Sequence, residues 1–354
     1  MKGKIKLTRF VWISTVLVST ILFSAKVHCQ APKVNEKPIE LKFASVSTPV
    51  NITMTKVAIP WAKELEKATN GRLKIVFYSS HSMGRTKDHY DFAVNGISDI
   101  SFTLPVFTPG RFPLTSIIEL PFMSPNSVVG TQVMFDLFQK FPEIVAEHSR
   151  VKVLWIQVTP PSQVHTVKKL IKTLDDFKGM TLGSGGGLQM KTITMLGAAP
   201  QNIPSQEAYQ ALQRKVIEGI MISYSSLVGN KLHEVARYHT RVNAWSFNII
   251  CVMNRKSYDS LPKDLQNIID DVSRRTWLNA GKGIDEGDEE SLEILRKTGV
   301  NTIYEMTEEE NQKLRAAVKP LWDQYAGDLE AKGLPGRKIV DEAFRLTQKY
   351  GKGE

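Results

Sequence analysis

The feature that most constrains the fold is an alternation of strand-like and helix-like segments in the first third of the chain. The strand-like segments are short, rich in apolar residues and bounded by polar or turn-forming residues; they lie at 41–46, 72–78 and 99–104. The segments between them carry apolar side chains at helical spacing; they lie at 53–69 and 86–95. This β-α-β-α-β order predicts a largely parallel sheet flanked by helices.

The rest of the chain suggests a second sheet and two crossings between lobes. A strand at 151–158 is followed by Pro160-Pro161, which breaks the strand and marks the first crossing. A second strand at 248–254 is expected to return to the first lobe. Helices are predicted at 205–219, 262–296 and 307–327. A two-lobed α/β protein of this kind places its ligand in the cleft between the lobes, where the carboxyl ends of strands meet.

The N-terminus has the layout of an export signal. Four basic residues precede an apolar run from Phe10 to Phe23, which is shorter than the ~20 residues that a membrane span needs. We therefore expect residues 1–29 to be a signal peptide and the mature protein to be periplasmic. Lys26, Val27 and His28 lack the small side chains that lipoprotein processing requires, so we expect no lipid anchor at Cys29.

Charge and cysteine content exclude two classes of protein. Residues 1–29 contain five of the 46 Lys and Arg residues and no acid, which leaves 41 basic and 36 acidic residues in the mature chain. The charges form no basic stripe interleaved with aromatic residues, so we expect no nucleic-acid partner. After signal removal only Cys251 remains, so no internal disulfide is possible, and its apolar surroundings predict a buried, inert thiol.

Known catalytic and cofactor motifs are absent. The run "GSGGGL" (183–188) has no following Lys for a P-loop, and Leu188 replaces the third Gly of the dinucleotide fingerprint. "HEVAR" (233–237) has Arg237 where a zinc-protease motif needs its second His. No nucleophile elbow and no convergent acid–base pair is found, so we expect no enzyme, no metal and no cofactor.

Several blocks of the sequence resemble the TRAP-type extracytoplasmic solute-binding proteins of the DctP type. The blocks occur in the family's order and lie at 61–78, 92–102, 110–122, 173–182, 196–219 and 233–240. The resemblance covers nearly all of 40–350. It implies capture of a small organic ligand, usually an organic acid, and delivery to the membrane subunits of a TRAP transporter, which would dock on both lobes. We expect a monomer.

The resemblance also implies a two-lobed, periplasmic-binding-protein-like α/β fold of type II, with crossing strands and a long bracing helix. On this basis lobe I is expected to comprise 38–160 and 247–283. Lobe II is expected to comprise 161–246 and 297–354. The long connecting helix is expected at 262–296.

Polar positions of the family's ligand site are apolar or neutral in this sequence. The family places an arginine just after the strand that follows "KG", and this position is Gly183. A second frequent arginine falls on Gln163. Four further contacts fall, by spacing, on Val46, Leu104, Ser205 and Ile222. With His165, Ser184, Tyr224, Trp245 and Phe247 near the crossings, these positions are the candidate ligand-binding residues.

Two interpretations follow from the loss of charge. In the first, the ligand is bulkier and more apolar or aromatic, with at most one acid group; Gly183 makes room for it and Tyr224, Trp245 and Phe247 pack against it. In the second, an anion is still held, but by backbone N–H groups of the Gly183–Gly187 loop at a helix start, assisted by Gln163 and His165.

Alternatives remain at both the residue and the functional level. Five candidate contacts have a structural alternative. Ser205 is alternatively a helix N-cap. His165 is alternatively a surface or core histidine, Ile222 and Leu104 are alternatively core residues, and Trp245 is alternatively a packing residue. An exported enzyme on the same fold, or a binding protein for sensing or delivery without transport, are the functional alternatives.

Overall fold

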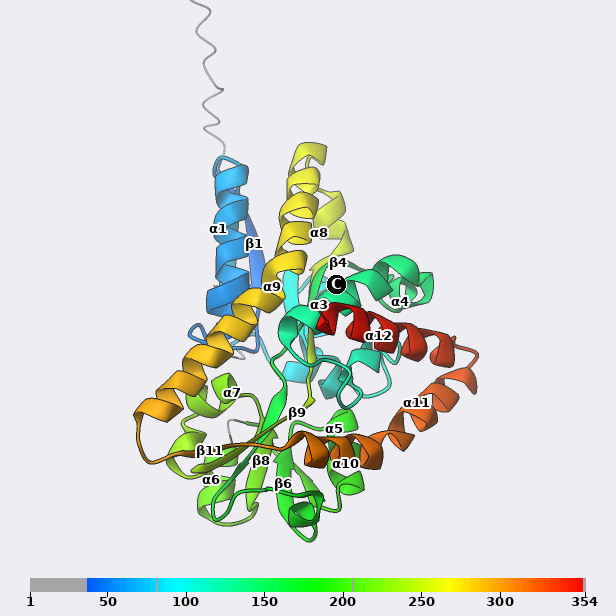
Figure 1. Ribbon diagram of the computed structural model, residues 1–354. Helices are drawn as coiled ribbons and strands as arrows, with labels where there is room; N and C mark the ends of the chain where they lie inside the picture. The colour runs from blue at the N-terminus through cyan, green and yellow to red at the C-terminus, as the bar shows by residue number, and fades with distance from the viewer. Residues whose placement is uncertain (1–36, 81, 206, 353–354) are drawn as a thin grey trace, which may run out of the picture. The chain divides into compact units, whose positions relative to one another are not determined.

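Two β-sheets organise the chain, and the computed structural model describes them within residues 37–80, 82–205 and 207–352 (Figure 1). The predicted signal peptide at 1–29 lies outside the described residues. The chain from Lys37 onward forms one unit, so both sheets belong to the same body. They are called sheet A and sheet B below.

Sheet A has five strands in the order β2-β1-β3-β10-β4. The bounds are β1 Ile39–Ala44, β2 Leu73–Tyr78, β3 Ile100–Thr103, β4 Val151–Val158 and β10 Asn248–Asn254. β1 pairs in parallel with β2 and β3, and β10 runs antiparallel to β3 and β4. The parallel opening and the return of β10 to this sheet confirm the predictions from the sequence.

Sheet B has six strands in the order β11-β9-β5-β8-β6-β7. The bounds are β5 Ser162–Thr166, β6 Thr181–Ser184, β7 Ala199–Asn202, β8 Gly219–Ile222, β9 Tyr238–Trp245 and β11 Thr302–Glu305. β6 is parallel to β7 and β8, and β11 is parallel to β9. β5 alone is antiparallel to both of its neighbours, β8 and β9.

The helices connect these strands and cover the sheets. The α-helices are α1 Ile59–Ala68, α2 His89–Asn95, α3 Ser127–Lys140, α4 Pro142–Glu147, α5 Gly187–Met195, α6 Ala208–Gln213, α7 Tyr224–Gly229, α8 Arg255–Asp259, α9 Lys263–Lys297, α10 Glu308–Val318, α11 Pro320–Glu330 and α12 Gly336–Gly351. A π-helical segment and five 3-10 turns add η1 Thr53–Ala58, η2 Thr86–Asp88, η3 Pro105–Phe107, η4 Thr115–Glu119, η5 Leu174–Phe177 and η6 Leu232–Glu234.

Two short passages link the sheets, from β4 to β5 and from β9 to β10, and the segment that contains α9 forms a longer third link, from β10 to β11. The two passages bond to each other: the amide of Thr159 donates to the carbonyl of Phe247 at 2.8 Å, and the amide of Phe247 donates to Oγ1 of Thr159 at 2.9 Å. At these passages β4 and β9 end and β5 and β10 begin, so both passages lie at the same edge of each sheet. Loops that follow β1 and β3 in sheet A therefore lie toward the loops that follow β6, β8 and β9 in sheet B.

Helix α9 is shared by both lobes, as Figure 1 shows by its course past sheet A and α7. Its first half packs in the core of sheet A, and Leu292 and Leu295 pack in a cluster beside β8. Two carboxylates one turn apart bind the N-termini of other helices. Asp285 accepts from the amides that open α3, at 2.9 and 3.0 Å, and Asp288 accepts from the amide of Ser225 in α7 at 2.7 Å.

The C-terminal segment differs from the prediction. Residues 297–354 were expected in lobe II; β11 joins sheet B there, and α10 packs there through Leu314 and Val318. α11 and α12 join the core of sheet A, where Leu321, Ile339 and Leu346 are buried. The reason is that α12 lies against α3, so the chain returns to lobe I after α10.

Candidate ligand-binding site

The candidate residues of lobe I lie just beyond strand ends of sheet A. Val46 follows β1 by two residues and is half-buried. Leu104 follows β3 directly and packs against the core of sheet A. Both side chains are apolar, so this edge offers a ligand no charge at either position.

The candidate residues of lobe II gather mostly at the facing edge of sheet B. They lie at the ends of β6, β8 and β9, at the start of β5 or just beyond, and comprise Gln163, Gly183, Ser184, Ile222, Tyr224, Trp245 and Phe247. His165 lies farther along β5, opposite Ile220. Ser205 follows β7, but α6 begins only at Ala208 and has Glu207 at its N-cap position, so Ser205 is not its N-cap.

The amide of Gln163 is fully occupied by the protein. Its Oε1 accepts from the backbone amides of Val242 and Asn243 at 2.8 and 3.0 Å. Its Nε2 donates to Oδ1 of Asn243 at 2.7 Å and to the carbonyl of Pro161 at 3.0 Å. These bonds hold the irregularity between β5 and β9, where Asn243 has φ +47°. The side chain of Gln163 therefore has no N–H group left to donate to a ligand.

His165 is also enclosed by protein partners. Its Nδ1 lies 2.9 Å from Nδ1 of His239, and its Nε2 lies 3.1 Å from the carbonyl oxygen of Ile222. Burial holds the pKa of His165 well below its usual range, and the nearby His239 acts in the same direction. A neutral, fully paired imidazole provides no cation for a carboxylate.

The space beside Gly183 is filled. A Cβ on Gly183 would lie 2.8 Å from Cδ1 of Ile217 and 3.3 Å from Cγ1 of Ile220. Both isoleucines are buried in the cluster that also contains Ile222 and Tyr224. Neighbouring aliphatic side chains thus occupy the space that a longer residue would need. The room that the first interpretation assigned to the ligand at Gly183 is not open in this structure.

The glycine loop (Gly183–Gly187) has some of its backbone N–H groups bonded to side chains of the loop itself and of Gln189. Oγ of Ser184 donates to Oε1 of Gln189 at 2.8 Å and accepts from the amide of Gly186 at 3.1 Å. The amide of Gly185 donates to Oε1 of Gln189 at 3.2 Å. Gly186 and Gly187 have φ values of +104° and +61°, which side-chain-bearing residues rarely adopt. Two of the N–H groups that the second interpretation assigned to an anion are therefore already used.

The same loop is approached closely by two apolar side chains. Cζ of Phe247 lies 2.9 Å from where a Cβ of Gly185 would be, and Cγ2 of Val106 lies 2.9 Å from where a Cβ of Gly187 would be. Val106 belongs to η3 of lobe I, so the glycines allow contact across the lobes. Val106 and Gln189 were not predicted from the sequence, although Val106 lies just beyond the end of a strand, where ligand contacts are expected.

The aromatic candidates differ in their surroundings. Trp245 is buried and meets the half-buried Phe247 edge to face, with ring centroids 3.8 Å apart. Tyr224 is buried beside His165, with ring centroids 5.5 Å apart. Burial raises the pKa of Tyr224, so its phenol is neutral. Trp245 and Phe247 thus lie at the sheet edge, while Tyr224 and Ile222 pack in an interior cluster.

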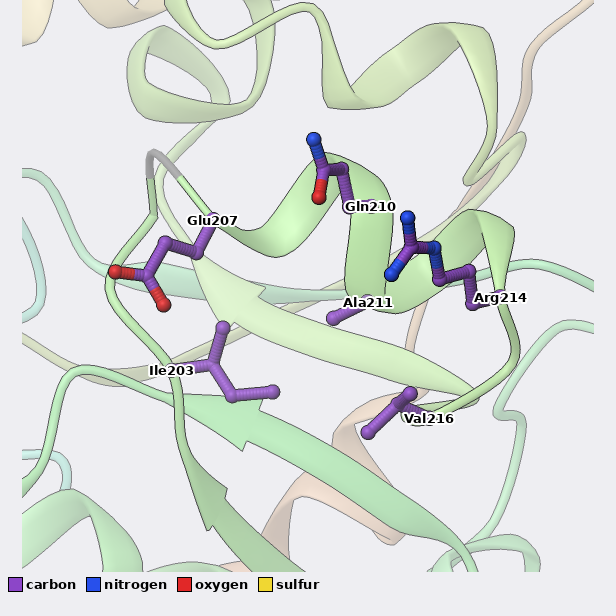
Figure 2. Close-up of a pocket in the computed structure, with 6 residues that line it drawn as sticks. All are labelled: Ile203, Glu207, Gln210, Ala211, Arg214 and Val216. Atoms are coloured by element: carbon purple, nitrogen blue, oxygen red, sulfur yellow. The ribbon is translucent and has the colours of Figure 1, made fainter.

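A pocket of about 400 Å³ lies beside α6 on lobe II (Figure 2). It is lined by Ile203, Glu207, Gln210, Ala211, Arg214 and Val216. All six belong to the segment between β7 and β8, and no lobe I residue contributes. Ser205 lies between two of these residues in sequence but does not line the pocket.

Comparison with known proteins identifies the family. The family described as bacterial extracellular solute-binding protein, family 7 (DctP), matches residues 43–328. This chain belongs to it. A curated family member, the C4-dicarboxylate-binding periplasmic protein of Rhodobacter capsulatus, is 22% identical over 309 residues, which cover 86% of this chain and 91% of that protein. The recognition of a TRAP solute-binding protein from the sequence is thereby confirmed.

Two solved TRAP solute-binding proteins share the fold. One, from Rhodoferax ferrireducens T118 with copurified benzoate, is 28% identical with a TM-score of 0.82 and covers 89% of this chain and 99% of its own. Another, from a marine metagenome and specific for aromatic acid ligands, binds metahydroxyphenylacetate. It is 26% identical with a TM-score of 0.82 and covers 88% of this chain and 99% of its own. Both confirm the two-lobed α/β fold.

The helices give no membrane-spanning segment within the described part of the chain. None between residues 37 and 352, positions 81 and 206 aside, combines enough length with enough apolar character to cross a bilayer.

Proposed function

We propose that this TRAP solute-binding protein captures a small aromatic monocarboxylate between its lobes and delivers it to the membrane subunits of a TRAP transporter. The protein would act in the periplasm after removal of residues 1–29. Closure of the lobes would enclose the ligand, because a ligand shifts the equilibrium toward the state that binds it better.

The observation that carries this proposal is the apolar character of the facing edges. Val106 and Phe247 lie against the glycine loop, and Trp245 packs on Phe247. Among the eleven candidate positions none is Asp, Glu, Lys or Arg, and the one histidine is neutral. A dicarboxylate in such surroundings would bury an uncompensated charge, which is strongly unfavourable, whereas an aromatic ring fits them.

The solved relatives support the same ligand class. The Rhodoferax protein retained benzoate through purification, and the marine protein is specific for aromatic acids. The dicarboxylate-binding relative from Rhodobacter is less similar to this chain, at 22% identity.

Mass spectrometry of ligand that copurifies with the mature protein would test the proposal. A thermal-shift series should follow, with benzoate, 3-hydroxybenzoate and mandelate compared with succinate and malate. We expect stabilisation by at least one aromatic acid and none by the diacids. Stabilisation by the diacids alone would contradict the proposal.

Two alternative functions can be distinguished from transport by experiment or by gene order. An exported enzyme would consume the bound acid, so turnover of the copurified ligand would favour that alternative. A sensor or delivery protein would bind the same ligand but would not lie beside genes for two transporter membrane subunits.

A further inference from the structure

Gln189 is a buried side chain that hydrogen-bonds to three separate segments of lobe II. It lies in the first turn of α5, and 0% of its surface is exposed. Its Oε1 accepts from Oγ of Ser184 at 2.8 Å and from the amide of Gly185 at 3.2 Å. Its Nε2 donates to the carbonyl of Met221 at 3.1 Å and to Oγ of Ser162 at 3.3 Å. Both ends of this buried amide are therefore paired.

The partners of Gln189 lie at three strand ends that border the candidate site. Ser184 is the last residue of β6, and Met221 lies one residue before the end of β8. Ser162 is the first residue of β5 and pairs with Trp245, the last residue of β9. The candidate ligand-binding positions of sheet B are thus among these residues or next to them in the chain. One amide on α5 holds the ends of β6 and β8 and the start of β5 together.

The shape of the glycine loop depends on Gln189. The amide oxygen of Gln189 holds the hydroxyl of Ser184, and that hydroxyl oxygen accepts from the amide of Gly186 at 3.1 Å. Glycine loses more conformational freedom on folding than any other residue, so a glycine-rich loop needs such bonds to keep one shape. Cγ2 of Val106 and Cζ of Phe247 each lie 2.9 Å from where a Cβ of the loop would be. The shape of the loop therefore determines how closely these two apolar side chains approach it.

We propose that Gln189 is a positioning residue for ligand binding: it fixes the glycine loop against the ends of β5 and β8 and thereby sets the affinity for the bound acid. The proposal rests on the proposed function, and Gln189 acts through the loop without touching the ligand. An amide suits this role because it accepts on one side and donates on the other. An aliphatic side chain would leave the buried donors of Ser184 and Gly185 unpaired, which is unfavourable.

Two methionine variants of the mature protein would test the role. Gln189→Met removes the amide at similar size. Gln266→Met is the matched control, since Gln266 is also buried and its Nε2 donates to the carbonyl of Leu261 at 2.9 Å. Gln266 lies on α9, which follows the end of β10 that is farther from the crossing. Titration calorimetry with benzoate and with succinate measures Kd. We expect a rise of at least about tenfold for Gln189→Met and a change within about twofold for the control.

Hydrogen exchange measures the loop itself and requires no ligand. The amide of Gly185 donates to Gln189, so its exchange should be at least about tenfold faster in Gln189→Met. Gln266→Met should leave this rate unchanged, because its bonds lie in lobe I.

Gln189→Glu provides a readout that packing alone would not change. Its protonated carboxyl keeps an acceptor for the loop and a donor for the carbonyl of Met221, whereas the ionised form directs negative charge at that carbonyl. Burial raises the pKa of a carboxyl group, so the protonated form is favoured as pH falls. We expect Kd, relative to the unmodified protein at the same pH, to fall at least about tenfold from pH 8 to pH 6. Gln266→Glu should show no such change.

The outcomes separate the two levels of inference. If the unmodified protein binds succinate and not benzoate, the proposed function fails, and the variants are compared with succinate. Unchanged Kd in Gln189→Met, or unchanged exchange of Gly185, would overturn the positioning role while the function stands. An equal loss of affinity in Gln266→Met would attribute the effect to general destabilisation and overturn the role as well. Binding of neither acid would overturn both inferences. If Gln189→Met does not fold, the pH dependence of Gln189→Glu decides.

Discussion

At the residue scale, Gln163 and Gly183, where the resemblance led us to expect arginines in other family members, have different surroundings. The side-chain amide of Gln163 bonds to Val242 and Asn243 of β9 and to the carbonyl of Pro161. Gly183 lies against Ile217 and Ile220, which occupy the volume beside it. Both positions are thus enclosed by groups of the protein itself.

Gly183→Arg should lower the stability of the protein without ligand. The new side chain would meet Ile217 and Ile220, and overpacking of this kind typically costs about 1–3 kcal/mol. Urea denaturation measures the change. Gly229→Arg is the control, because a Cβ there meets no atom within 4 Å, and we expect its free energy of unfolding to change little. Equal stability of Gly183→Arg and the parent would show that the isoleucines move aside.

Glu119 should make stability fall as pH rises. Burial raises its pKa to about 8 from 4.5, and among the described residues it accepts a bond from the amide of Asn248 at 3.3 Å. The folded state keeps the proton up to about pH 8, while the unfolded state releases it above about pH 4.5, so stability is lost across that interval. Glu119→Gln should flatten this decline by several kcal/mol, measured by denaturation at pH 5 and pH 8. Parallel pH profiles for both proteins would contradict the expectation.

At the scale of elements, α9 joins the two lobes because it bonds to one helix in each of them. Asp285 and Asp288 bind the N-termini of α3 and α7, where an anion is favoured by the helix dipole. Gly281 permits close packing on α3: a Cβ there would lie 2.5 Å from the carbonyl oxygen of Ser127.

Gly281→Ala should therefore separate α9 from α3. The contact is with backbone, which cannot rotate away, so we expect a loss of about 1–3 kcal/mol in the free energy of unfolding. Gly327→Ala in α11 is the matched control, since its Cβ meets nothing within 4 Å. Alanine there should be neutral or stabilise by up to about 1 kcal/mol. If both variants change the free energy of unfolding equally, the close packing at Gly281 does not contribute to stability.

At the scale of the whole molecule, the two lobes meet through residues that are far apart in the sequence. Val106 from η3 meets the glycine loop before α5, and Leu188 of α5 packs in the core of sheet A. A ligand that binds only the closed arrangement would stabilise the protein by about 2.7 kcal/mol at 100 times its Kd.

Val106→Asp should weaken ligand binding by disturbing the contact between residue 106 and Gly187. A carboxylate against Gly187 would have to be desolvated on closure, so we expect at least about a tenfold loss of affinity for the aromatic acid. Titration calorimetry measures the affinity, and small-angle scattering should show a smaller ligand-induced change in radius of gyration. Val128→Asp, at a side chain 47% exposed, is the control. Unchanged affinity in Val106→Asp would show that closure does not bury this residue.

Most strands and several helices could be predicted from the sequence because their patterns are local. The strands at 151–158 and 248–254 have the predicted bounds, and the long helix is shifted by one residue. Two helices differ. The one expected over 205–219 covers only Ala208–Gln213, since Lys215 has φ +60°. The one expected over 307–327 is divided at Pro320, which opens α11 because proline fits the first turn of a helix.

The sequence by itself determined the family, the parallel opening of sheet A, the return of β10 and the burial of Cys251, whose thiol has a raised pKa. All of these depend on local periodicity or on ordered blocks. Tertiary structure alone decided what each candidate side chain meets. Gln163 and His165 were predicted as ligand contacts, yet their partners lie on β8 and β9, and α12 returns to lobe I. Contacts between distant segments leave no local sequence pattern, because they depend on which segments pack together as the chain folds.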